Sequence, residues 1–249
     1  MKRFESKQVL VTGGTSGIGL AAAQAFAAEG ARVAVTGRSE AGLSEALTAL
    51  GAGALAVRND ASNLEQAKDL AGQLSKEGFQ LDAIFLNAGT AKFAPLEAVE
   101  EALWDEIFDT NVKGAYFQIQ ALLPLLKPGA SIVINGSINA RIGMPNSSVY
   151  AASKAALISL AKTLSAELLP RGVRVNVVSP GPVTTPLYGK LGLSASDLEA
   201  TATQIQSQIP LGRFGTPEEV ATTVLHLAAA ESAFIVGTEI FVDGGMSQL

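Results

Sequence analysis

Cysteine is absent from this chain of 249 residues, and histidine occurs only once. Without cysteine the protein can form neither a disulfide nor a zinc site built from thiolates, so we expect no metal. The single imidazole, His226, lies in the apolar helical pattern of Val224–Ala228, and we interpret it as a packed structural residue. The chain therefore has almost no imidazole with which to perform general acid catalysis.

Long apolar runs and blocks of like charge are missing as well. No run reaches the roughly 18 residues that a membrane span requires, and the net charge of −5 gives no basic footprint for nucleic acid. Residues Met1–Glu5 lead directly into a strand pattern at Gln8, which leaves no room for a signal peptide. We therefore expect a cytoplasmic protein that has neither nucleic acid nor a membrane as a partner.

Apolar residues make up 48% of the chain and charged residues 16%, which favours a sheet that is buried on both faces. Apolar β-branched runs alternate with helical patterns from end to end. This alternation predicts an α/β fold in a single domain of residues 1–249, a doubly wound (Rossmann) seven-stranded parallel sheet with helices on both faces. The predicted strands are Gln8–Thr12, Arg32–Thr36, Ala54–Asn59, Ala83–Leu86, Ser131–Asn135, Arg174–Val178 and Glu239–Val242. The predicted helices include Ile18–Glu29, Ala41–Leu50, Leu64–Lys76, Ala102–Leu126 and Val149–Leu168.

One region breaks the alternation of strands and helices. Three prolines, Pro180, Pro182 and Pro186, open a long segment that contains a modest helical pattern at Ala195–Gln206. Long connections in a compact domain are usually functional or disordered. We expect a substrate lid at about residues 184–211.

A glycine-rich loop, Gly13–Gly19, links the first predicted strand to the first predicted helix. Its spacing is G-x-x-x-G-x-G, and these glycines let the backbone turn tightly and approach a pyrophosphate. The helix that follows supplies free N–H groups and the positive end of its dipole. The loop predicts a dinucleotide site bound by Gly13, Thr15, Ser16, Gly17, Ile18 and Gly19.

The end of the second predicted strand indicates which nicotinamide cofactor is used. Enzymes that bind NAD carry an acidic residue there, about 20 residues past the glycines, to hold the ribose 2′-hydroxyl. Gly37 occupies about that position, Arg38 and Ser39 follow it, and the first acid is Glu40. A guanidinium can pair with a 2′-phosphate, so the sequence favours NADP(H), with Arg38 and Ser39 at that phosphate. The alternative is that Arg38 is an ordinary solvated charge.

Tyr150 and Lys154 supply the chemistry that histidine and cysteine do not. They stand one helical turn apart, so their head groups can approach the same substrate. A free phenol has a pKa of about 10, and an adjacent cation favours the phenolate. The alternative is a surface helix that contains Y-x-x-x-K by chance.

Together these motifs resemble the short-chain dehydrogenase/reductase family, in its shorter one-domain branch. The likeness covers nearly all of the chain. One departure is Ser16, because members that prefer NADP often carry a second basic residue there. The motifs that carry the resemblance are the glycine loop, Asn59-Asp60-Ala61, Asn87-Ala88-Gly89, Asn111, Ser137, Tyr150-xxx-Lys154 and Pro180-Gly181.

The resemblance implies hydride transfer between a nicotinamide cofactor and a ketone, aldehyde or alcohol, with Tyr150 as general acid and base. Lys154 would lower the pKa of this phenol and bind the nicotinamide ribose. Ser137 would hold the carbonyl oxygen and Asn111 would anchor a proton-returning water chain, although a turn cap and a helix kink are the alternatives for these two. The remaining cofactor contacts would be Asp60 and Ala61 at the adenine, Asn87, Ala88 and Gly89 beside the cofactor, and Val183 and Thr185, after Pro180 and Gly181, at the carboxamide.

The expected substrate is a small apolar or aromatic carbonyl compound or alcohol, because the presumed substrate wall contains Ile138, Met144, Leu187 and Tyr188. In appearance the chain is similar to bacterial NADP-dependent alcohol dehydrogenases and carbonyl reductases. One alternative is a 3-oxoacyl-[acyl-carrier-protein] reductase, which typically has a basic cluster before the fifth strand. Here that segment, Leu122–Gly129, holds a single lysine, although Arg171 and Arg174 remain. A remoter alternative is a non-catalytic dinucleotide sensor, a class that tends to lose the tyrosine or the lysine.

The helices predicted at Ala102–Leu126 and Val149–Leu168 are too apolar for a single solvent-facing stripe. The family resemblance suggests that they pair across subunits in a homotetramer with two-fold axes. The C-terminal run to Leu249 would pack at a second interface.

Overall fold

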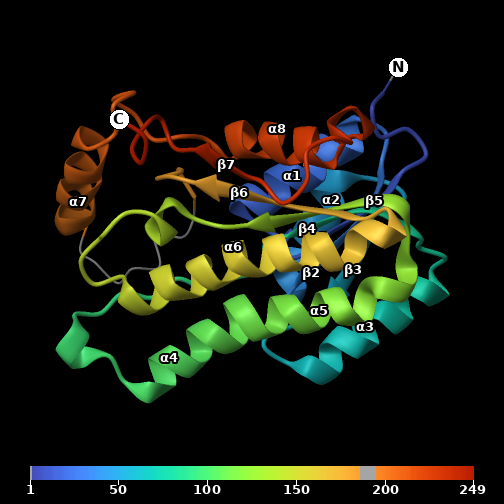
Figure 1. Cartoon of the computed structure of the whole chain (residues 1–249), viewed down its shortest axis with the longest axis horizontal. Coiled ribbons are helices and arrows are strands. Elements are labelled where there is room, and N and C mark those ends of the chain that lie inside the picture. The colour runs from blue at the N-terminus through green and yellow to red at the C-terminus, as the bar shows by residue number, and fades with distance from the viewer. Residues whose placement is uncertain (1, 186–194) are drawn as a thin grey trace.

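The computed structural model describes residues 2–185 and 195–249 and is built around one parallel sheet (Figure 1). Its seven strands follow the order β3-β2-β1-β4-β5-β6-β7, so the expected doubly wound sheet is confirmed. The strands are β1 (Gln8–Val11), β2 (Arg32–Gly37), β3 (Leu55–Arg58), β4 (Leu81–Leu86), β5 (Leu126–Asn135), β6 (Arg174–Pro180) and β7 (Glu239–Val242).

Helices cover both faces of the sheet (Figure 1). The first, second and eighth helices lie on one face, and the third to sixth lie on the other. None of the helices in the described part of the chain is long and apolar enough to cross a membrane. The helices are α1 (Gly17–Ala28), α2 (Glu40–Leu50), α3 (Leu64–Lys76), α4 (Glu101–Phe108), α5 (Ala115–Leu122), α6 (Ser148–Leu168), α7 (Ala195–Ser207) and α8 (Pro217–Ala228).

The core consists of two apolar layers, because successive side chains of a strand point to opposite faces. In β1, Val9 and Val11 pack toward α1 and α8, whereas Leu10 between them packs toward α3, α5 and α6. In β5, Ile132 and Val133 divide between the two layers in the same way. This two-sided burial explains why the strands read as continuous apolar runs in the sequence.

The long helix predicted at Ala102–Leu126 is interrupted. A π-helical segment, Asp109–Gly114, separates α4 from α5. At its end the backbone packs tightly, since a Cβ on Gly114 would lie 2.1 Å from the carbonyl oxygen of Ala61. Such π-helical turns occur frequently at functional sites. The pattern of apolar residues continues through this segment and does not show the interruption.

The sheet reverses its strand order between β1 and β4. Open α/β sheets bind ligands at this switch point, outside the carboxyl ends of the strands. Gly13 follows β1 closely and Asn87 follows β4 directly, so both lie at this edge. The fold therefore brings together motifs that are far apart in the sequence.

Candidate active site

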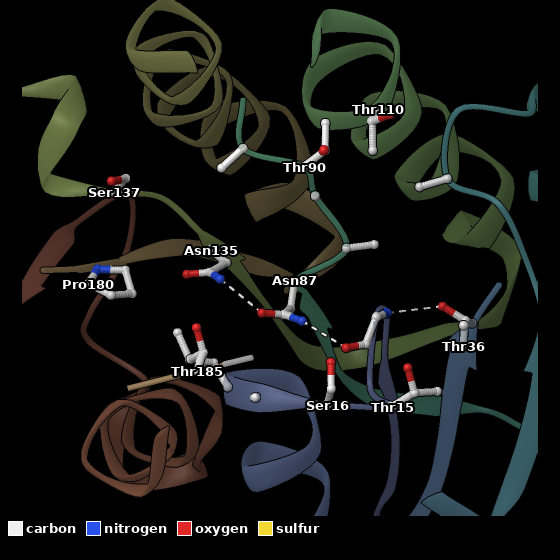
Figure 2. A pocket seen from close by; sticks show the side chains of 18 of the residues that line it. Thr15, Ser16, Thr36, Asn87, Thr90, Thr110, Asn135, Ser137, Pro180 and Thr185 are labelled. Carbon is white, nitrogen blue, oxygen red and sulfur yellow. Dashed lines mark hydrogen bonds between the residues drawn. The ribbon is translucent and has the colours of Figure 1, made fainter. Parts of the chain in front are cut away.

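A cavity of about 360 Å³ opens at the carboxyl ends of the central strands (Figure 2). It collects nearly all of the residues that the sequence assigned to a cofactor. These are Gly13, Thr15, Ser16, Gly17, Ile18, Arg38, Asp60, Ala61, Asn87, Ala88, Gly89, Tyr150, Lys154, Pro180, Gly181, Val183 and Thr185.

The glycine loop has the geometry of a pyrophosphate cradle. Gly13 has a φ of 61° and Gly17 a φ of 52°, a left-handed conformation that glycine adopts readily. Ser16 caps α1 without a side-chain hydrogen bond, which leaves the first N–H groups of the helix open to an anion. Gly19 does not line the cavity; instead, a Cβ there would lie 2.2 Å from the carbonyl oxygen of Gly13. Its role is to let the helix pack under the loop.

At the end of β2, Gly37 supplies no carboxylate to the cavity. A Cβ on Gly37 would lie 2.5 Å from Cγ2 of Thr15, so an acidic side chain there would require Thr15 to move. Arg38 is exposed at the rim of the cavity and has no hydrogen bond or ion pair with any described residue. Ser39 does not line the cavity, contrary to expectation. Its hydroxyl accepts a hydrogen bond from the amide of Gly42 at 3.4 Å and caps α2.

Asp60 is held in place by two glutamines that the sequence did not single out. The amide of Asp60 donates to Oε1 of Gln66 at 2.7 Å. Nε2 of the buried Gln118, on α5, donates to Oδ1 of Asn59 at 2.9 Å, which fixes the residue before Asp60. These partners are distant in the sequence, so no local motif indicates them.

Tyr150, Ser137 and Lys154 meet at the other end of the cavity. Ser137 and Tyr150 both line the cavity, and Ser137 lies near enough to the phenol to lower its pKa. Lys154 is 5% exposed, and its Nζ donates to the main-chain carbonyl of Asn135 at 2.7 Å. The same Nζ lies 5.8 Å from the centroid of the Tyr150 ring. The sequence did not single out Asn135, and the N-x-S pattern that it forms with Ser137 is the signal that could have found it.

Burial is the main cause of the pKa shifts of Tyr150 and Lys154. Burial raises the pKa of the Tyr150 phenol above its ordinary value, and the proximity of Ser137 acts in the opposite direction. Burial lowers the pKa of Lys154 from 10.5 to about 8. Lys154, which the sequence assigned to lowering the pKa of Tyr150, donates from its ammonium to the carbonyl of Asn135 in the free protein.

Asn111 lies in the π-helical segment and is 1% exposed. Its Oδ1 accepts from the amide of Thr90 at 2.8 Å, and its Nδ2 donates to the Thr90 carbonyl at 2.9 Å and to Ser153 Oγ at 3.0 Å. The Ser153 hydroxyl in turn donates to the carbonyl of Tyr150 at 2.7 Å. Asn111 is not among the residues that line the cavity, and its side chain joins the loop after β4 to α6.

The expected substrate wall is divided by the structure. Met144 lines a second cavity of about 340 Å³ beside the first turn of α6. Ile138 is 2% exposed and lines neither cavity, so it does not contribute to the wall as expected. Leu187 and Tyr188, with much of the predicted lid, lie outside the described residues, and the helical pattern after them is confirmed as α7. Phe93, which the sequence did not single out, packs edge-on against Tyr150 at 5.7 Å between ring centroids.

Two basic residues away from the cavity differ from their sequence interpretations. His226 is exposed on the outer side of α8, so it is not packed in the core. Arg174 is 6% exposed and donates to the carbonyls of Leu227 and Ala229 at 3.0 and 3.2 Å, which caps the end of α8. Nowhere in residues 2–185 and 195–249 do three or more histidine, aspartate or glutamate side chains gather as metal ligands would.

Comparison with known proteins agrees with this geometry. A family model described as enoyl-(acyl carrier protein) reductase matches residues 13–247. Oxidoreductase asL5 of Sarocladium schorii is 38% identical over 251 residues, covering 100% of this chain and 99% of its own. The 3-oxoacyl-[acyl-carrier-protein] reductase FabG of Thermotoga maritima is 38% identical over 251 residues, covering 98% of this chain and 99% of its own.

A solved structure described as a short chain dehydrogenase/reductase family protein is 39% identical, covers 100% of both chains and has a TM-score of 0.87. The chain belongs to the short-chain dehydrogenase/reductase family. Members of this family are oxidoreductases that generally use NAD(P)H. The family resemblance drawn from the sequence is therefore confirmed.

Proposed function

We propose that the protein is an NADP(H)-dependent alcohol dehydrogenase or carbonyl reductase acting on apolar or aromatic substrates. The observation that carries this proposal is one cavity with the glycine loop at one end and Tyr150, Ser137 and Lys154 at the other. When bound, the reduced nicotinamide supplies the hydride that reaches the carbonyl carbon. The protein must supply the proton and hold the oxygen.

Tyr150 donates the proton to the carbonyl oxygen during reduction. Burial raises the pKa of Tyr150, so the phenol is protonated at neutral pH and holds the proton that reduction requires. Ser137, which lines the cavity with Tyr150, holds the same carbonyl oxygen. Lys154 binds the nicotinamide ribose, and its positive charge stabilises the phenolate that forms. Asn111 is a positioning residue, because it reaches Tyr150 only through Ser153.

Two observations at the end of β2 favour NADP(H) over NAD(H). Gly37 stands at the usual position of the acid and has no carboxylate for a ribose 2′-hydroxyl, and a larger side chain there would require Thr15 to move. Arg38 lies at the cavity rim without a partner among the described residues, so its guanidinium is available to a 2′-phosphate.

The second cavity supports an apolar substrate. Leu96, Ile142, Met144 and Pro145 contribute to its wall, and none of the described residues that line it is charged. Phe93, which packs against Tyr150, is followed by Ala94 in the wall of this cavity, so the apolar surface lies near the reacting end.

A 3-oxoacyl-[acyl-carrier-protein] reductase is the second candidate, favoured by the 38% identity to the Thermotoga maritima enzyme. The basic residues considered for docking an acidic carrier argue against it. Arg174 is buried at the end of α8, and Lys127 is paired with Asp82 at 2.7 Å. Arg171 is exposed, but its guanidinium is bonded to the carbonyl of Leu123 at 2.9 Å.

We also propose a homotetramer. Large apolar side chains are exposed on α4 and α5, where Trp104 is 46% and Tyr116 is 37% exposed, and Phe234 near β7 is fully exposed. Such groups on separate faces suit a protein with two kinds of interface. Light scattering that reports a tetramer at micromolar concentration is expected, and a monomer would contradict this proposal.

A panel of ketones and alcohols assayed with NADPH and with NADH tests the function. We expect turnover of apolar or aromatic ketones with NADPH, and far less turnover with NADH. Activity confined to acyl-carrier-protein thioesters would favour the second candidate. Equal efficiency with both cofactors would contradict the assignment of NADP(H).

A further inference from the structure

A chain of hydrogen bonds crosses the floor of the cavity and ends in an atom without a partner (Figure 2). Nδ2 of Asn135, at the end of β5, donates to Oδ1 of Asn87 at 2.9 Å. Nδ2 of Asn87 donates to the carbonyl of Gly13 at 3.0 Å, and the amide of Gly13 donates to Thr36 Oγ1 at 3.2 Å. Oδ1 of Asn135 is buried and has no hydrogen-bond partner among the described residues.

The orientation of the Asn135 amide follows from its neighbours. Nδ2 of Asn87 faces two main-chain carbonyls, those of Thr12 and Gly13, at 3.1 and 3.0 Å. A carbonyl accepts and never donates, so Asn87 must present its Nδ2 to this pair and its Oδ1 to Asn135. Only a donor satisfies that oxygen, so Asn135 must turn its Nδ2 toward Asn87. Its own Oδ1 is then directed elsewhere.

That oxygen lies at the reacting end of the cavity. Figure 2 shows it turned away from Asn87, on the side of Pro180 and Thr185. The main-chain carbonyl of the same residue accepts from Nζ of Lys154, and Ser137 follows two positions later on the chain. Arg38, which marks the adenosine end, lies beyond β1 at the end of β2. A ligand group that reaches Asn135 therefore belongs to the nicotinamide half of a dinucleotide.

A buried acceptor without a partner favours any ligand that brings it a donor. We propose that Oδ1 of Asn135 accepts a hydrogen bond from a donor on the nicotinamide half of the cofactor. Asn135 then binds the cofactor with its side chain and positions Lys154 with its main chain. This inference rests on the proposed function. The nicotinamide half offers two kinds of donor, the carboxamide N–H groups and the ribose hydroxyls.

The test uses the full-length protein and three probes measured by isothermal titration calorimetry. The first is NADP⁺, the second is 2′-phospho-ADP-ribose, which lacks only the nicotinamide ring, and the third is adenosine 2′,5′-bisphosphate, which lacks the whole nicotinamide half. Asn135→Leu removes the acceptor at similar size. We expect it to weaken NADP⁺ about 3- to 10-fold and to leave the bisphosphate within about 2-fold. A loss with 2′-phospho-ADP-ribose assigns the donor to the ribose, and its absence assigns it to the carboxamide.

Two outcomes of the calorimetry would contradict the role proposed for Asn135. An equal loss with all three probes would mean that Asn135 only supports the glycine loop through Asn87, and no loss with any probe would mean that only water pairs with the oxygen. Either result overturns the proposal. Asn135→Ser replaces the amide by a shorter hydroxyl that does not extend to the position of Oδ1. If the leucine variant unfolds, the serine variant should show the same order of losses with the three probes. Asn139→Leu, at a half-buried residue outside the cavity lining, is the matched control and should bind all three probes normally.

The wild-type protein separates this inference from the proposed function. If it binds neither NADP⁺ nor NAD⁺, the proposed function fails before any variant is made. If it prefers NAD⁺, the choice of cofactor fails, and the same comparison with NAD⁺, ADP-ribose and AMP still decides the role of Asn135.

Discussion

The buried ammonium of Lys154 should make the stability of the free protein rise with pH. Burial lowers the pKa of Lys154 from 10.5 to about 8, so between these values the unfolded chain binds more protons than the folded protein. The free energy of unfolding therefore increases with pH in this window. The whole shift corresponds to roughly 3 kcal/mol, of which about 2 kcal/mol falls between about pH 7.5 and about pH 9.5. Tyr150 acts in the opposite direction only above pH 10, because burial raises its pKa above the model-compound value of 10.0.

Urea unfolding of the protein without cofactor, followed by circular dichroism across this pH range, measures the effect. Lys154→Met removes the titrating group, so the wild type should gain about 2 kcal/mol relative to this variant as the pH rises. Lys162→Met, at an exposed position on the same helix, is the matched control and should follow the wild type. If the free energy of unfolding changed with pH in the same way for the wild type and for Lys154→Met, the reasoning would be refuted. That result would show that burial does not lower the pKa of Lys154.

Three further predictions concern the cofactor loop and the helix interruption. Arg38→Ala should weaken NADPH about 10-fold or more and leave NADH within about 2-fold in a fluorescence titration, since only the 2′-phosphate loses a partner. Gly37→Asp alone should not improve the use of NADH, because its Cβ would lie 2.5 Å from Thr15, whereas the double variant Gly37→Asp with Thr15→Ala should improve it. If Gly37→Asp alone switched the cofactor, the steric argument would be contradicted. Gly114→Ala should lower the melting temperature, because its Cβ would lie 2.1 Å from the carbonyl oxygen of Ala61. Gly72→Ala, in α3 where a Cβ meets no neighbouring atom, should raise the free energy of unfolding by about 0.5–1 kcal/mol.

Much of the fold and the cofactor cavity could be predicted because their signals are local. A strand buried on both faces reads as an apolar run, and the turn after β1 needs glycine at Gly13 and Gly17 for its left-handed backbone. The carboxyl ends of neighbouring parallel strands meet at one edge. Motifs placed after β1, β4 and β5 therefore converge without further information.

What the sequence did not show depends on contacts across the fold. The side-chain amide of Asn111, for example, is bonded to the Thr90 backbone and to Ser153 on another helix. Ile138 follows Ser137 at the cavity, yet it turns into the core. His226 lies in an apolar segment, but the rotation of α8 places it outside. A single sequence carries no signal for these tertiary contacts.

The central claim is that Tyr150 is the general acid of a carbonyl reductase, and its removal tests this directly. The measurement is single-turnover and steady-state reduction of the best ketone found, with NADPH, by Tyr150→Phe. General acid catalysis contributes about 100- to 10,000-fold, so turnover should fall by at least about 100-fold while NADPH still binds. Tyr116→Phe, on α5 and 37% exposed, should keep wild-type turnover. Near-normal reduction by Tyr150→Phe would contradict the account.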